Sequence, residues 1–231
     1  MKNISGNLPS SNSITAFQLS ILSWGNQNLR SFPWRSGNFS NYQLVIAEIL
    51  LQRTKVETVI RYMPEFFKKY ASWRSLSKAS ITELQKILEP IGLSKRRAYV
   101  LERLSHQIVS HNGRIPCKRE EIDKLTGVGQ YIGNAIELLC CGNVKPLLDV
   151  NMARVLERYF GPRKLVDIRY DPYLQDLAHK VVEVDDPVTI NWVILDFAAL
   201  VCRSRKPECV DCPLSGCCKY YIETDKISID K

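Results

Sequence analysis

Apolar residues along the chain recur at helical spacing, and the strict alternation typical of half-buried strands is scarce. Between residues 95 and 111 one apolar stripe is formed by Ala98, Leu101, Leu104 and Ile108. Near the other end, Asp186 and Pro187 are typical N-cap and first-turn residues of a helix that continues to about Cys202. Further helices are expected over residues 42–56, 81–88, 118–125, 130–141, 151–159 and 171–182. The pattern predicts an all-α protein of about nine helices.

The length and composition agree with a folded chain of one large or two small domains. The chain has 231 residues, 45% of them hydrophobic, and no stretch rich in glycine, serine or proline that would form a linker. No apolar run is long enough to cross a membrane, and residues 1–13 are polar, which predicts a flexible tail and no secretory signal. We therefore expect a cytoplasmic protein, nucleoid-associated in a bacterium or archaeon. Its eight cysteines should then be reduced and need another explanation than disulfides.

Charge points to the kind of partner. The formal net charge is +8, and a basic excess of this size favours a polyanion, with nucleic acid as the first candidate. Charge alone is a weak signal, because many basic proteins bind no DNA.

Four cysteines near the C-terminus are spaced like cluster ligands. Six, two and five residues separate Cys202, Cys209, Cys212 and Cys218. A structural zinc site usually joins two close pairs from separate knuckles, whereas here single cysteines flank one Cys-x-x-Cys pair. This spacing favours a [4Fe–4S] cluster held by four thiolates. A zinc knuckle or free thiols are the alternatives, and spacing alone does not decide between Cys217 and Cys218.

Two segments are candidates for contact with phosphates. Arg203, Arg205 and Lys206 lie between the first two cysteines, so that a pinned loop would carry three cations; a solvated charge run is the alternative. Between the helices expected at 118–125 and 130–141, Gly127, Val128 and Gly129 form a turn. Its glycines would let a phosphate approach the backbone at the start of the next helix. An ordinary interhelical turn is the alternative.

Two carboxylates stand where chemistry is possible. Asp149 follows an apolar stretch and begins a helix, where it could be an N-cap or could stabilise a developing positive charge. Glu48 lies in an apolar helix, where burial would raise the pKa of its carboxyl group and make it a proton donor near neutrality. An ion pair with a core arginine is the alternative for Glu48.

The motifs occur in an order that resembles a known family. They are FPWR at 32–35, EILLQRT at 48–54, LTGVGQY at 125–131, LLDVNMARV at 147–155, DFAALVC at 196–202 and the cysteine loop. Together they resemble the endonuclease III superfamily of helix-hairpin-helix DNA glycosylases, over residues 30 to 220. The resemblance implies two helical lobes. One is a six-helix barrel with the hairpin, residues 39–143, and the other is an iron–sulfur lobe, residues 14–38 and 144–231.

The resemblance also implies a partner and its contacts. The partner would be double-stranded DNA with a mismatch, bound by a monomer in the groove between the lobes. Gln52 and Leu93 match the family's two wedge positions, which fill the base stack once a base has left it, and Arg53 adjoins the first wedge. The family's cysteine spacing favours Cys218 over Cys217 as the fourth ligand.

The residue after the hairpin distinguishes the branches of the family. Members that also cleave the strand carry a lysine two positions after the last glycine, and this chain has Tyr131 there. A phenol cannot form an imine, so the resemblance implies a monofunctional glycosylase. Three features favour the thymine or uracil branch over the adenine branch: the triplet Gln52–Thr54, the sequence Asp196–Ala198, and an end about a dozen residues after Cys218.

The expected chemistry is hydrolysis of an N-glycosidic bond. Asp149 would stabilise the oxocarbenium-like sugar and orient or deprotonate water, and Glu48 would assist departure of the base. Tyr131 would contact the flipped base, and Asn151 would position the water or the sugar. The alternatives are excision of adenine opposite oxidised guanine, and a DNA-binding protein on the same scaffold without catalysis.

Overall fold

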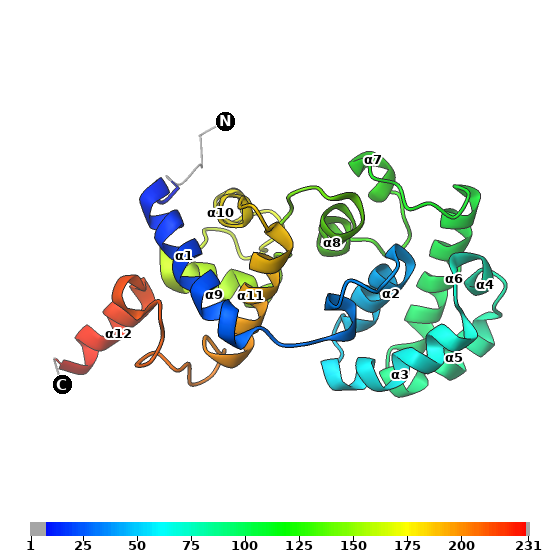
Figure 1. Ribbon diagram of the computed structural model, residues 1–231, viewed down its shortest axis with the longest axis horizontal. Helices are drawn as coiled ribbons and strands as arrows, with labels where there is room; N and C mark the ends of the chain where they lie inside the picture. Colours follow the sequence, from blue (N-terminus) through cyan, green and yellow to red (C-terminus); the bar gives the residue numbers. More distant parts are fainter. Residues whose placement is uncertain (1–7, 230–231) are drawn as a thin grey trace. The chain divides into compact units, whose positions relative to one another are not determined.

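A computed structural model describes residues 8–229, and all regular secondary structure within them is helical (Figure 1). The prediction of an all-α fold is therefore confirmed. The tail expected at 1–13 lies partly outside the described residues, and residues 11–13 already belong to the first helix. No helix of the described part is long and apolar enough to cross a membrane.

The chain divides into two compact units. One comprises the chain through Arg30 together with the chain from Val144 onward, and the other comprises Ser31–Asn143. Residues 31–38 pack with the second unit, because Trp34 is buried in its core. The sequence-based prediction had grouped residues 14–38 with the C-terminal third. In the structure, residues 31–38 group instead with the unit that follows them. A stack of Trp34 on Phe32, with ring centroids 5.0 Å apart, accompanies this burial.

The unit of residues 31–143 is a helical bundle around one apolar core. Its elements are η1 (Pro33–Arg35), α2 (Asn41–Leu51), α3 (Val56–Lys69), α4 (Trp73–Leu76), α5 (Ile81–Leu88), η2 (Glu89–Ile91), α6 (Ser94–Ser110), α7 (Arg119–Ile122) and α8 (Gln130–Cys141). Helix α6 packs against α4 and α5, while α2 packs against α3 and α8. Since α2 is apolar on nearly all sides, these neighbours bury most of it.

The other unit brings together the two ends of the chain. Its elements are α1 (Ser11–Asn28), α9 (Val150–Phe160), α10 (Pro172–Val182), α11 (Pro187–Leu200), η3 (Ser215–Cys217) and α12 (Lys219–Ile229). Helix α1 packs against α10 and α11, and a Cβ at Gly25 would lie only 2.4 Å from Val193. Phe17 of α1 packs against the rings of Tyr159 and Phe160. The N-terminal helix is thus part of the core built by the C-terminal third.

Polar caps explain where many of the helices begin. Ser80 and Glu83 form a reciprocal capping box at the start of α5. Aspartates cap the three long helices of the C-terminal third, namely Asp149 for α9, Asp171 for α10 and Asp186 for α11. The side chain of each accepts a hydrogen bond from a backbone N–H of the first turn, as the sequence predicts for Asp186.

The helix expected over residues 42–56 is two helices. α2 ends at Leu51 and α3 begins at Val56, with Arg53 in the turn at a φ of 56°. Residues 52–55 are all polar (Gln, Arg, Thr and Lys), so the expectation had extended one helix across a polar turn as far as Val56. α3 itself was not expected, since Pro64 lies inside it.

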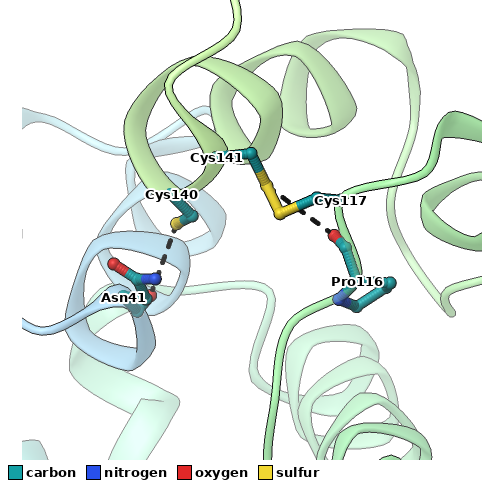
Figure 2. Close-up of a disulfide and its surroundings, with 5 residues drawn as sticks. All are labelled: Asn41, Pro116, Cys117, Cys140 and Cys141. Carbon is teal, nitrogen blue, oxygen red and sulfur yellow. Dashed lines mark hydrogen bonds between the residues drawn. A yellow bond between two sulfur atoms is a disulfide. The ribbon is translucent and has the colours of Figure 1, made fainter.

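A disulfide joins Cys117, two residues before α7, to Cys141, the last residue of α8 (Figure 2). The expectation that cysteines outside the cluster pattern are reduced is therefore wrong for this pair. The closed loop contains α7, the turn at 126–129 and the whole of α8. The neighbouring Cys140 is not part of the bond, and its Sγ lies 4.0 Å from the carbonyl oxygen of Asn41.

Candidate functional site

Asp149 stands at the N-terminus of α9 with both carboxylate oxygens hydrogen-bonded. Oδ1 accepts from the backbone N–H groups of Asn151 (2.8 Å) and Met152 (2.9 Å), and Oδ2 accepts from the side-chain amide of Asn151 (2.6 Å). The side chain is only partly buried, so that it is both an N-cap and accessible for chemistry.

A chain of hydrogen bonds connects Asp149 with the cysteine segment. The Asn151 side-chain oxygen accepts from Arg154 Nη1 at 3.1 Å. Arg154 also donates to the carbonyls of Ala198 (3.0 Å) and Cys202 (2.9 Å), at the end of α11. One arginine therefore ties the start of α9 to the start of the cysteine loop.

Two buried polar residues of α11 hold the segments that flank the site. Asn191 accepts from the backbone N–H of Leu147 at 2.6 Å and donates to the Lys145 carbonyl at 3.1 Å. It thereby fixes the chain that leads into Asp149. The Asp196 carboxylate, which is fully buried, forms an ion pair of 2.7 Å with Arg30 just after α1.

Four cysteine thiols line one cavity. Cys202, Cys209, Cys212 and Cys218 contribute to its wall, and its volume is about 370 Å³, part of it open to solvent. Burial, together with the smaller effect of the three neighbouring cysteines, raises the pKa of the Cys212 thiol to about 11, although a backbone hydrogen bond at Leu214 opposes this rise. Cys217 is exposed and lines another cavity, beside Tyr159.

Within the described residues, no three cysteine, histidine or acidic side chains converge closely enough to hold a single metal ion. A [4Fe–4S] cluster is a different case, because each thiolate binds its own iron at a corner of the cube. Four thiols around the wall of one cavity match the four-thiolate ligand set of such a cluster.

The loop between the first two cysteines is held from α9. Arg158 donates to the carbonyl of Arg203 at 2.8 Å and lies 3.4 Å from the Cys202 sulfur. Its guanidinium also packs over the Tyr220 ring, 4.6 Å from the centroid. The three expected phosphate contacts, Arg203, Arg205 and Lys206, are all exposed on this loop, although Arg203 forms an ion pair with Glu208 at 2.7 Å.

The turn between α7 and α8 is shaped by close packing against α6. Gly127 has a φ of 77°, and a Cβ there would lie 2.3 Å from the Val100 side chain. The Gln107 side chain accepts from Thr126 N–H (2.8 Å) and donates to the Lys124 carbonyl (3.1 Å). These contacts brace the turn on both sides.

Gly129 is the N-cap of α8, and a Cβ built on it would meet no atom within 4 Å. A phosphate therefore has room to approach the backbone at the positive end of this helix.

Glu48 and Tyr131 lie on the two packed helices α2 and α8. Glu48 is 7% exposed and lines a small apolar cavity with Ile132, Ile136 and Cys140 among others. Its charge, after burial, contributes to raising the pKa of the Cys140 thiol to about 12. Tyr131, in the first turn of α8, packs partly buried against the core of this unit.

The two expected wedge residues lie at exposed turns of the same unit. Gln52 ends α2, with Arg53 next to it, and Leu93 precedes α6. Leu93 is 49% exposed and has a φ of 51°, a left-handed conformation that costs a non-glycine residue about 1–2 kcal/mol. Such backbone strain is concentrated at functional segments.

The expected site residues therefore fall into two sets, one in each unit of the chain. Asp149, Asn151 and the cysteine loop belong to the unit formed by the chain ends. Glu48, Gln52, Arg53, Leu93, Gly127, Val128, Gly129 and Tyr131 belong to the unit of residues 31–143. Sequence reasoning missed Arg97, Arg154 and Arg158, most of whose partners are backbone carbonyls that carry no sequence signal.

Comparison with known proteins gives a consistent set of relatives. Residues 46–169 match the HhH-GPD superfamily base excision DNA repair protein family. Thymine-DNA glycosylase of Aeropyrum pernix is 33% identical over 90% of this chain and 95% of its own length. Thymine/uracil-DNA glycosylase of Pyrobaculum aerophilum is 35% identical over 92% of this chain and 95% of its own. Adenine DNA glycosylase of Homo sapiens is 29% identical over 89% of this chain but only 39% of its own length.

Solved structures agree with the fold. A thermostable thymine-DNA glycosylase superposes with a TM-score of 0.86 at 34% identity, over 92% of this chain and 98% of that one. A trapped covalent complex of endonuclease III with DNA superposes with a TM-score of 0.79, over 94% of this chain and all of that one. At 20% identity, the second likeness speaks for the fold alone.

Proposed function

Because the chain belongs to the HhH-GPD superfamily of base excision DNA repair proteins, we propose that it is a monofunctional DNA glycosylase that removes thymine or uracil opposite guanine. The observation that supports the base preference is the degree of sequence identity. The thymine and thymine/uracil relatives are 33% and 35% identical to this chain, whereas the human adenine enzyme is 29% identical.

Asp149 is the proposed centre of the reaction. When the glycosidic bond breaks, positive charge develops on the sugar, and an accessible carboxylate beside it lowers the energy of that state. The hydrogen bonds from α9 and Asn151 fix the orientation of the Asp149 carboxylate. In this arrangement it can also orient or deprotonate the attacking water.

The residues of the other unit would act on the base. Glu48 lines a small, mainly apolar cavity between α2 and α8, and it would assist departure of the base through proton donation or a water. Tyr131, in the first turn of α8, would line the pocket for the flipped base. Because a phenol forms no imine with the sugar, the product would be an intact strand with an abasic site.

DNA would be held through its backbone. The turn at Gly127, Val128 and Gly129 offers backbone amides to a phosphate, and the loop with Arg205 and Lys206 offers charge. The partner is duplex DNA with a mispaired base, since mispairing lowers the cost of flipping the base out.

A [4Fe–4S] cluster is the proposed occupant of the cysteine cavity. Cys202, Cys209, Cys212 and Cys218 would hold it, and their shared cavity supports this set over one that includes Cys217. When bound, it would supply a rigid crosslink of the loop, because glycosidic hydrolysis transfers no electron.

The direct test is a set of duplexes labelled on one strand, carrying G·T, G·U or adenine opposite oxidised guanine. After incubation with the protein, alkali converts each abasic site into a strand break. We expect breaks in the G·T and G·U duplexes that depend on alkali. Cleavage of the adenine duplex alone would overturn the base preference, and cleavage of none would overturn the enzymatic function.

A further inference from the structure

One buried arginine bonds to two turns that are distant in sequence. Arg97, in the first turns of α6, is only 4% exposed. Its terminal nitrogens donate to four carbonyls and one hydroxyl: Nη1 to Ile91 (3.0 Å) and Gly92 (2.6 Å), and Nη2 to Leu50 (3.0 Å), Gln52 (2.5 Å) and Thr54 Oγ1 (2.6 Å). One guanidinium therefore connects the end of α2 with the end of η2.

The bonded carbonyls are those that helix ends leave without partners. The last carbonyls of a helix have no intrahelical donor, and the helix dipole favours a cation beside them. Arginine is suited to this place because its planar fork carries five N–H donors and stays charged when buried. A lysine would bring a single nitrogen and could not reach both turns in the same way.

These two turns carry Gln52 and Leu93, the two exposed residues that match wedge positions. Leu93 and the neighbouring Arg53 both have positive φ, at 51° and 56°. Non-glycine residues persist in this conformation only where surrounding contacts hold them. Arg97 contributes contacts of this kind to both turns, beside the hydrogen bonds within each turn.

We propose that Arg97 is a positioning residue that fixes the spacing of Gln52 and Leu93, so that both enter the base stack together when the target base leaves it. This inference rests on the proposed glycosylase function. Arg97 touches no DNA; it acts through the two turns. Because Arg97 already fixes the two turns, they lose little conformational entropy when Gln52 and Leu93 enter the base stack. More of the binding energy is therefore available for unstacking the base.

The first experiment measures base unstacking without turnover. Asp149→Asn protein is mixed with a G·U duplex that carries the fluorescent base 2-aminopurine next to the uracil. We expect 2-aminopurine fluorescence to rise when the Asp149→Asn protein binds. The double variant Asp149→Asn, Arg97→Met should bind the duplex without this rise. An unchanged rise would overturn the proposal. Arg103→Met is the matched control, because Arg103 lies exposed on the same helix and pairs with Tyr99.

The second experiment asks whether Arg97 acts through Leu93. We expect Arg97→Met to slow single-turnover excision from G·U by roughly 10–100-fold, the cost of a small misplacement. In a Leu93→Ala background the same change should cost much less, since coupled residues are not additive. Equal losses in both backgrounds would overturn the proposal. Arg97→Lys should give an intermediate rate, because the single nitrogen of a lysine can hydrogen-bond to only one of the two turns.

Two readouts separate this inference from simpler explanations. A thermal unfolding curve like that of the wild type shows that Arg97→Met folds; if it does not, the comparison is made with Arg97→Lys instead. If the wild-type protein excises neither thymine nor uracil, the proposed function fails, whatever the Arg97 variants do to fluorescence.

Discussion

The side-chain amide of Asn151 donates a hydrogen bond of 2.6 Å to Asp149, whose other carboxylate oxygen accepts two backbone N–H groups of α9. Asp149→Asn keeps a good N-cap but removes the charge, so we expect stability to change little. Single-turnover excision from a G·U duplex should fall by about 10²–10⁴-fold, with mismatch binding retained. Asp186→Asn, at the N-cap of α11, is the control and should keep full activity. A wild-type rate for Asp149→Asn would contradict the assignment.

Tyr131→Lys should create a strand-cleaving activity. A lysine at this position would place an amine where related bifunctional enzymes form a Schiff base with the sugar. Borohydride should then trap a covalent protein–DNA adduct, visible as a slower band on a denaturing gel. Tyr99→Lys, an exposed position in the same unit, adds the same amine and should trap nothing. The absence of an adduct from Tyr131→Lys would show that a side chain at this position does not reach the sugar.

Cys218→Ser and Cys217→Ser should behave differently although the residues are adjacent. Only Cys218 shares the cavity of the other three cysteines. Purified Cys218→Ser should lose the broad visible absorption and most of its iron, whereas Cys217→Ser should keep both. Zinc in place of iron in the wild-type protein would contradict the cluster.

Loss of the Cys117–Cys141 disulfide should destabilise the unit of residues 31–143. The bond joins residues separated by 24 positions, and closing a loop of this length contributes roughly 3–4 kcal/mol in the chain-entropy view. Cys117→Ser and Cys141→Ser should therefore unfold at lower temperature than the wild type. Cys217→Ser, which changes an exposed thiol, is the control. Alkylation of both cysteines in the unfolded, unreduced protein would show that the bond does not form.

The ion pair between Arg30 and Asp196 should matter far more than surface pairs. Asp196 is fully buried, so Arg30→Met would remove the ion-pair partner of a buried carboxylate and lower the free energy of unfolding by about 3 kcal/mol. Lys180→Met breaks the exposed pair with Glu183 and should cost less than about 1 kcal/mol. Equal effects of the two variants would contradict this ranking.

Local signals in the sequence predicted much of the helical framework. Asp186 with Pro187 marked the start of α11, and the apolar stripe of residues 95–111 marked α6, because capping and periodicity act within a few residues. The turn at 126–129 was also predicted, since the glycines stand between two helical patterns.

Features that depend on distant partners could not be predicted. Nothing in the spacing of Cys117 and Cys141 distinguishes a bonded pair from free thiols. Arg97 is one arginine among many in the sequence, and its importance comes from carbonyls that any residue supplies. The separation of α2 and α3 was missed although residues 52–55 are polar, and the turn that they form accepts hydrogen bonds from the distant Arg97.

Helix α6 adjoins two features that we propose to face DNA. Its first residues adjoin Leu93, and farther along Val100 and Gln107 pack against the turn that contains Gly127. The number of α6 residues between these two features therefore determines the distance between Leu93 and the turn at Gly127, with about 1.5 Å of helix rise for each residue. One residue inserted between positions 97 and 100 would also rotate one feature by about 100° relative to the other. If both features contact DNA as proposed, the length of α6 would match the distance between the vacated position in the base stack and a backbone phosphate.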